Sequence, residues 1–551
     1  MENIEAPTAN PQNLLNIVRE TYDAKVVLPE FQRPFIWSRE DIEEALSSIL
    51  HGYFVGTFLM LDTPSGKPMF FFRWVEGLDK VNDNIPQHQI VRLILDGQQR
   101  ITSLFYALYQ PDISLHNSKN PYKFFLRLDV AMEGDIDEAV VGISTHDRRR
   151  MAEINQLVES HQALSFRIFN DPSSFYRWLY NEQNVWNDAD RKLIESLYRR
   201  FTEFMIPVVN LPYNTGKDNI INIFERINRT GISLSLFDLA VARLCINGVN
   251  LKSYWIKFTA TRSEATKLIK PEFLLKLIAV LRGLDPRKAN LLDMLDSFNK
   301  NNFDDIWNSA VIAIDSSYER ITKKYGVLRP DSIPYTTMIV PLAAMLSKLE
   351  KLTLSEKDYR KIDSWYWSNV FSQRYDSAVD TKVIQDVRDV VNWVNDGNKP
   401  DWIQKLADKE LDINVEEPRS AIYKGIMCLI AHQSAKDFIS GLETMLHECQ
   451  DDHIFPQSVY RNDFHVDTIL NRTLISKSTN TKLKRAKHPS KFFAECLVAH
   501  GNSESNLLNT LDSHFISPTS YEFLKKNDFE NFILEREKML NIKIKELIAG
   551  A

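Results

Sequence analysis

One change of hydrophobic pattern divides this chain. Before residue 220, short apolar runs alternate with turn residues, which predicts strands at 26–28, 58–61, 70–72, 91–95, 124–128 and 206–209. From there to about residue 411, apolar residues recur at helical spacing, with few glycines and many aromatic side chains. A chain of 551 residues exceeds one hydrophobic core. We therefore expect a multidomain α+β protein.

The pattern suggests three domains. We place them at residues 1–247 (mixed α/β), 248–415 (α-helical) and 416–551, with a linker at 414–418 that contains proline and glutamate. Two helices are predicted in detail. Ser38 and Asp41 form a capping-box pattern for a helix through Leu50, and the chain ends in a long helix over 528–548.

Composition excludes several classes of protein. The net charge of −6 gives no global nucleic-acid signature, so any DNA contact must come from a local patch. The four cysteines lie far apart without a CxxC pair, which argues against a thiolate zinc site and a disulfide framework. No apolar run is long enough to span a membrane, and the N-terminal residues do not resemble a leader. We expect a cytoplasmic protein with no membrane association.

A predicted strand-to-helix turn is the first candidate site. The apolar run 91–95 stops at Asp96 and Gly97, and a helical pattern begins with Gln98, Gln99 and Arg100. The first N–H groups of a helix and an arginine fork both suit phosphate oxygens. The alternative is an ordinary junction with a solvated arginine.

Two other segments carry polar residues in unusual settings. Gln32 and Arg33 stand among aromatic residues and prolines. Asn228 precedes a predicted helix end at Gly231, where its amide could bond a base or a ribose. A plain glycine C-cap would explain the second pattern equally well.

Four strings occur in one order and spacing: QRPFIW, GTFLML, ILDGQQRITSL and IFERINRTGISLS. Together they resemble the N-terminal domain of GmrSD-type restriction proteins over roughly residues 1–247. The resemblance implies a ParB/sulfiredoxin-like fold that binds and hydrolyses a nucleoside triphosphate, GTP or ATP. The implied nucleotide-binding residues are Gln32, Arg33, Asp96, Gly97, Gln98, Gln99, Arg100 and Asn228.

The second candidate site lies near the C-terminus. Metal-assisted phosphodiester hydrolysis needs a base for water and a hard cation on the phosphate. His453 follows an acidic residue and is the candidate base. Asp452 and Asn480 offer oxygen ligands of the kind Mg²⁺ prefers, and Asn471 could fix the turn or orient His453. The alternative is a surface turn.

A local excess of positive charge accompanies this site. Residues 471–493 contain seven Lys or Arg and no Asp or Glu. Such a surface would suit a DNA backbone, although a solvated helix face is the ordinary explanation. The predicted DNA-binding residues are Arg472, Lys477, Lys482, Lys484, Arg485 and Lys487.

The C-terminal pattern DHIFPQS, NRTLIS and N-x-K resembles an HNH (ββα-metal) nuclease surrounded by helices. The resemblance implies that His453 activates water, that Asp452 and Asn480 bind Mg²⁺ or Mn²⁺, and that Asn471 is the middle asparagine. Asp451 could replace Asp452 as the ligand.

We therefore expect a modification-dependent endonuclease or nickase that defends against phage, with double-stranded, modified DNA as substrate and an NTP as regulator. The DNA mark, the nucleotide, nicking against double-strand cutting, and a homodimer all stay open. One alternative senses a phosphorothioate or another backbone mark through an aromatic pocket at Phe31, Phe35 and Trp37. Another is a nucleotide-controlled DNA clamp with an inactive HNH tail.

Overall fold

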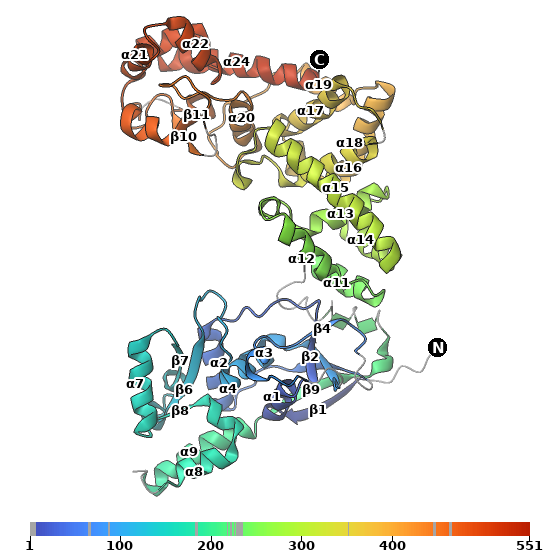
Figure 1. The fold of residues 1–551 in the computed structure, drawn as a ribbon, viewed down its shortest axis with the longest axis vertical. Helices are drawn as coiled ribbons and strands as arrows, with labels where there is room; N and C mark the ends of the chain where they lie inside the picture. Colours follow the sequence, from blue (N-terminus) through green and yellow to red (C-terminus); the bar gives the residue numbers. More distant parts are fainter. Residues whose placement is uncertain are drawn as a thin grey trace. The chain divides into compact units, whose positions relative to one another are not determined.

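The computed structural model describes residues 7–63, 68–85, 89–181, 186–216, 219–220, 223–224, 226, 235–350, 352–444, 448–461 and 465–550. The chain divides into two compact units, Met1–Ser253 and Tyr254–Ala551 (Figure 1). Helices and sheets occur in both units, which confirms the multidomain α+β class.

A six-stranded sheet forms the centre of the first unit. In spatial order its strands are β1 (Thr8–Asn13), β9 (Met205–Leu211), β3 (Phe58–Asp62), β5 (Arg92–Asp96), β2 (Val26–Pro29) and β4 (Phe72–Arg73). β5 pairs parallel with β2 and antiparallel with β3, so its end lies inside the sheet. The turn that follows β5 is therefore held from both sides.

Helices of the first unit cover this sheet. α1 (Leu14–Tyr22), α2 (Arg39–His51) and α4 (Gln98–Tyr109) share one hydrophobic core with residues of the strands. Ser38 caps α2 through the predicted capping box with Asp41. The remaining helices of this unit include α8 (Pro172–Leu179), α9 (Asp188–Thr202) and α11 (Leu236–Ile246).

A second, three-stranded sheet also belongs to the first unit. Its order is β7 (Val140–Ser144), β6 (Tyr122–Arg127) and β8 (Ala163–Ser165). Helix α7 (Arg148–Glu159) packs on it through Ile154, which joins Phe125 and Ile143 in a small core. Only β6 was predicted from the sequence.

The second unit begins with packed helices. α16 (Ile339–Leu349) contacts α13 (Pro271–Leu281), α15 (Lys300–Lys324) and α18 (Val379–Asp396). The predicted helical region is confirmed for the residues described between 235 and 407. Besides α11, the other α-helices of this region are α12 (Leu251–Thr261), α14 (Lys288–Leu295), α17 (Glu356–Phe371) and α19 (Asp401–Ala407).

The rest of the second unit surrounds a two-stranded antiparallel sheet, β10 (Cys449–His453) and β11 (Arg472–Ser476). α24 (Phe529–Ala549) runs from α23 (Pro518–Lys526) to α17 and α19 (Figure 1). Its fully buried Arg536 donates to the carbonyls of Leu470 and Arg472, each at 2.7 Å. The long C-terminal helix thus fixes the start of β11. Helices α20 (Ala421–His432), α21 (Pro489–Ala499) and α22 (Glu504–Asp512) complete this part.

Two details of the sequence prediction need correction. The predicted strand at 70–72 is shorter, because only Phe72 and Arg73 form β4. The predicted linker at 414–418 is fixed in place, since the carbonyl of Val415 accepts from the N–H of Ile469 at 2.8 Å. The proposed division at 415/416 accordingly falls inside the second compact unit, and the one at 247/248 lies close to its beginning.

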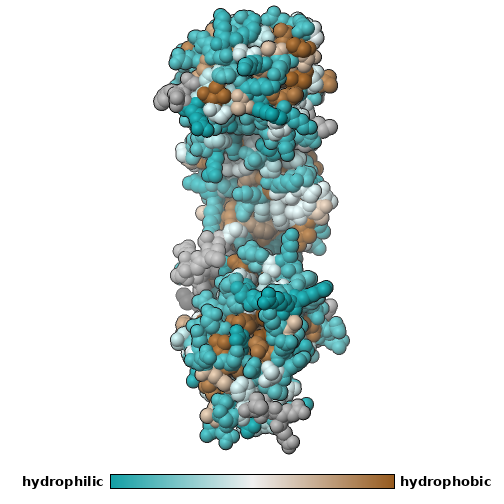
Figure 2. Space-filling model, turned by 90° about the vertical axis from the view of Figure 1, so that its left-hand side faces the viewer, coloured by the Kyte–Doolittle hydropathy of each residue, from teal (hydrophilic) through white to brown (hydrophobic). Residues whose placement is uncertain are grey.

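The surface and the cysteines complete this description. On the face that Figure 2 shows, hydrophilic residues cover most of the surface and hydrophobic ones form patches among them. Within the described part of the chain, no helix has the length and apolar character needed to cross a membrane. All four cysteines are buried as thiols.

The burial of His514 predicts that the folded second unit loses stability in acid. Its Nε2 donates to the carbonyl of Lys436 and its Nδ1 bonds Thr473 Oγ1, both at 2.7 Å, and burial lowers its pKa from 6.5 to about 4. Since the unfolded chain binds the proton first, stability is lost as the pH falls from about 6.5 towards 4. The loss should reach about 3 kcal/mol. Urea unfolding at pH 7 and 4.5 measures it, and H514Q should show a smaller difference. An equal pH dependence in both proteins would contradict this assignment.

Candidate nucleotide and nuclease sites

The predicted turn after β5 is confirmed in its geometry. β5 ends at Asp96, Gly97 takes a left-handed φ of 100°, and α4 begins at Gln98. A Cβ at position 97 would lie 2.1 Å from Cδ1 of Phe58. Glycine is therefore required here both by backbone conformation and by space.

The two glutamines of this turn hold the chain segment around Arg33. Gln99 donates to the carbonyl of Pro34 at 3.1 Å and accepts from the N–H of Ile36 at 3.0 Å, while Gln98 donates to the carbonyl of Arg33. Both glutamines are buried. The structure thus brings the DGQQR turn next to the QRPFIW segment. The side chains of Gln98 and Gln99 are used to bond the backbone of that segment.

Gln32 strengthens the same junction. Its amide donates to the carbonyls of Ile94 and Leu95, at 2.6 and 2.8 Å, from a buried position. The ammonium of Lys252 donates to the carbonyl of Gln32 at 3.0 Å, and burial lowers the pKa of Lys252. The amide nitrogen of Gln32 thus fixes the segment beside β5, while its Oε1 is buried without a partner among the described residues and stays a predicted nucleotide contact.

Arginine side chains remain as the candidate phosphate contacts. Arg100 donates to the carbonyl of Thr57 and lies 3.5 Å from the Asp96 carboxylate. Four buried polar atoms of this region have no hydrogen-bond partner in the described part of the chain: Oε1 of Gln32, Nε of Arg100, Nη1 of Arg33 and Oε2 of Glu76. Buried polar groups are normally satisfied, so these atoms indicate a place for a ligand. Asn228 lies outside the described residues.

The aromatic pocket considered for a backbone mark is not formed as expected. Phe31 is only 1% exposed. It makes edge-on contacts with Phe70 and Phe224, with ring centroids 5.3 and 4.8 Å apart. Phe35 packs against the hydrophobic core of the first unit. Phe31 is thus a core residue and does not line an open pocket.

The C-terminal candidate site is built on β10. Successive side chains of a strand point to opposite faces, so Asp451 and His453 share one face and Gln450 and Asp452 the other. His453 Nε2 lies 2.8 Å from Asp467 Oδ1. Burial, together with the positive charge of Arg472, lowers the pKa of His453. A lowered pKa favours the neutral ring that a general base requires.

Asn471 fixes the turn after His453. Its Oδ1 accepts from the N–H of Phe455 at 2.8 Å, and its Nδ2 donates to the carbonyls of Phe455 and Val466, at 3.0 and 2.9 Å. The side chain is fully buried. Of the two predicted roles, the geometry agrees with fixing the turn, because the amide bonds backbone atoms and not the His453 ring.

The predicted metal ligands have separate partners on the other face of β10. Asn480 donates to Gln450 at 3.3 Å, and Asp452 pairs with the ammonium of Lys484, both partners coming from the helical turn η10 (Thr479–Lys484). No three His, Cys, Asp or Glu side chains of the described residues gather into a metal-binding group. One carboxylate and one amide oxygen, completed by waters, still fit a magnesium ion. In this geometry the Lys484 ammonium neutralises the Asp452 carboxylate.

The cations of the predicted basic surface fall into two groups, those paired with carboxylates of the protein and those exposed to solvent. Arg472 pairs with Asp451 and Asp467, Lys484 with Asp452, and Lys487 with Glu495. These charges are already compensated within the protein and are poorly placed to hold a DNA phosphate. Exposed positions remain at Lys477, Lys482 and Arg485.

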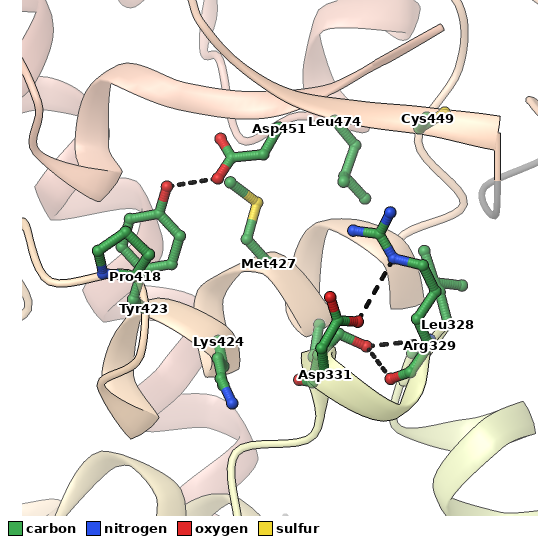
Figure 3. A pocket seen from close by; sticks show the side chains of 13 residues that line it. Leu328, Arg329, Asp331, Pro418, Tyr423, Lys424, Met427, Cys449, Asp451 and Leu474 are labelled. Carbon is green, nitrogen blue, oxygen red and sulfur yellow. Dashed lines mark hydrogen bonds and ion pairs between the residues drawn. The ribbon is translucent and has the colours of Figure 1, made fainter. Parts of the chain in front are cut away.

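A pocket of about 180 Å³ lies behind the same hairpin. Figure 3 shows its lining: the Tyr423 hydroxyl bonds Asp451 on one side, and Arg329 pairs with Asp331 on the other. Tyr423 belongs to α20 and Asp451 to β10. The walls of the pocket are therefore formed both by helices of the second unit and by the strand that carries His453.

Sequence reasoning did not find Asp467. It contacts His453 although it lies fourteen positions further along the chain. No local pattern marks it, because its role depends on how the segment before Asn471 folds back. Two acidic residues of that segment, Asp463 and Asp467, were the only signal, and nothing local distinguishes one from the other.

Comparison with known proteins gives the class of this chain. Residues 13–245 match the family described as the GmrSD restriction endonuclease, N-terminal domain. An uncharacterized protein of Methanocaldococcus jannaschii is 31% identical over 591 aligned positions, which cover 98% of this chain and 99% of that protein. The chain therefore belongs to one family with the archaeal protein, and its N-terminal part is similar to the N-terminal domain of GmrSD restriction endonucleases.

Proposed function

We propose that the protein is a modification-dependent DNA endonuclease or nickase, with an HNH centre in its second unit. The carrying observation is the placement of His453 at the end of β10, where the Asp467 carboxylate orients its ring. Asp452 precedes it in the strand and, like Asn480, lies toward the other face of the hairpin. The chain order of two hairpin strands followed by the helical turn η10 supports the ββα-metal arrangement that the sequence resembles. A domain of a restriction endonuclease family in the same chain supports DNA as the substrate.

In this proposal each residue has one task. His453 takes the proton from the attacking water, and Asn471 keeps the turn after it rigid. Asp452 and Asn480 would hold Mg²⁺ or Mn²⁺, which when bound stabilises charge on the scissile phosphate and the leaving oxygen. The exposed Lys477, Lys482 and Arg485 would contact the DNA backbone.

The first unit would bind and hydrolyse a nucleoside triphosphate on a ParB/sulfiredoxin-like fold. Its support is the turn from Asp96 to Arg100 with unsatisfied buried polar atoms around it. Because uncontrolled DNA cutting harms the host, nucleotide binding would license the nuclease by favouring one conformational state.

Cleavage of three DNAs with Mg²⁺, with and without GTP or ATP, tests the proposal. The substrates are unmodified DNA, DNA with glucosyl-hydroxymethylcytosine and phosphorothioated DNA. We expect cutting of one modified DNA only, changed by the nucleotide. Equal cutting of all three would remove the dependence on these modifications. No cutting under any condition would favour the clamp.

A further inference from the structure

A chain of hydrogen bonds and ion pairs stands behind His453. The bond from Nε2 to Asp467 Oδ1 has a fixed direction, because a carboxylate can only accept. The proton of the neutral ring therefore lies on Nε2. Nδ1 is left with the lone pair that a general base uses.

Asp467 is itself held in place. Its side chain is 40% exposed, so a carboxylate without partners would rotate. Arg472 Nη2 donates to its Oδ1 at 3.2 Å, and Gln457 Nε2 donates to its Oδ2 at 2.9 Å. With His453, three donors fix both oxygens of this carboxylate.

Arg472 connects this carboxylate to the helices of the unit. Its Nη1 donates to Asp451 Oδ1 at 3.3 Å, and Asp451 accepts from the Tyr423 hydroxyl of α20 (Figure 3). The Arg472 guanidinium therefore bridges two carboxylates on the face of the hairpin that carries His453. A side chain used in this way is preorganised and has little freedom to follow a DNA phosphate.

We propose that Asp467 is the positioning residue of His453, and that Arg472 fixes the position of the Asp467 carboxylate relative to α20. Asp467 contacts the base and not the substrate. It sets which ring nitrogen carries the proton and how the ring is turned. This inference rests on the proposed nuclease activity, yet its structural part can be measured without any cleavage.

The test uses D467A and D467E in the full chain. Long-range ¹H–¹⁵N correlation spectra of ¹⁵N-histidine protein report the tautomer of each of the twelve histidines, and H453A identifies the signals of His453. We expect the Nε2–H form in the wild type, a mixture in D467A and recovery in D467E. With metal and DNA, kcat should fall about 10- to 100-fold in D467A at unchanged KM.

The matched control is E416A. Glu416 Oε1 lies 2.7 Å from His465 Nδ1, so the chain contains a second histidine–carboxylate pair in the same unit, whose histidine precedes Asp467 by two residues and does not belong to β10. This variant should change the His465 signals and leave both His453 and cleavage unaltered. If D467A loses thermal stability, D467N replaces it, because an amide can accept from or donate to Nε2 and should also mix the tautomers.

The outcomes separate the inference from the proposed function. An unchanged His453 tautomer and unchanged kcat in D467A would overturn the positioning role. A wild-type protein that shows the Nε2–H form, loses it in D467A, but cuts no DNA would support the positioning and reject the nuclease.

Discussion

H453A should lose DNA cleavage while NTP hydrolysis continues at the wild-type rate. General-base catalysis contributes about 10²- to 10⁴-fold, so cleavage should fall by that factor. The proposed nucleotide turn lies in the first compact unit and His453 in the second, and the substitution removes only an imidazole at the end of β10. Nicking of supercoiled plasmid and phosphate release, measured on one preparation, give both rates.

H465A is the control for this substitution. His465 also has a carboxylate partner, Glu416, but its side chain is more exposed and lies off the hairpin. It should cut DNA as the wild type does. Unchanged cleavage in H453A would place the base elsewhere. If the wild type binds DNA without cutting it and H453A behaves identically, the protein is the nucleotide-controlled clamp.

Strands with an apolar signal could be predicted, and strands without one could not. β2 and β3 contain continuous apolar runs because the sheet is covered there. β9 is also apolar in sequence, although its residues alternate between exposed and buried positions, so the positions of all three strands follow from the sequence. β1 reads TANPQN and is mostly exposed at the sheet edge, where it pairs with β9 through main-chain bonds. Such an edge strand needs no apolar side chains, so its sequence resembles a loop.

In the candidate sites, too, local features could be predicted from the sequence and contacts between distant segments could not. The turn at Gly97 was predictable, because a strand, a glycine and a helical pattern are local features. The partners of Gln98 and Gln99 are backbone atoms near Arg33, about sixty-five positions away, and no local pattern indicates them. The separation of Asp452 from His453 onto two faces could have been read from strand alternation. The pairing of Lys484 with Asp452 depends on the path of η10.

R100A should lose most nucleotide binding in the first unit. Arg100 is the cation nearest the turn, and its Nε is buried without a partner in the described residues. A hydrogen bond to a charged group contributes about 1.5–3 kcal/mol, which corresponds to a loss of affinity of about 10- to 100-fold. Calorimetric titration with GTP and with ATP, in the absence of DNA, measures this loss and identifies the preferred nucleotide.

Two variants decide whether the loss comes from the guanidinium at this turn. R100K keeps the charge without the planar fork of donors, so its affinity should lie between those of the wild type and R100A. R127A removes another arginine of the same unit that is paired with a nearby aspartate, Asp129, and should bind normally. Wild-type affinity in R100A, with an unchanged melting temperature, would mean that the phosphate lies elsewhere. The unsatisfied atoms of Arg33 and Glu76 would then require another ligand, because burial leaves them too costly to keep unpaired.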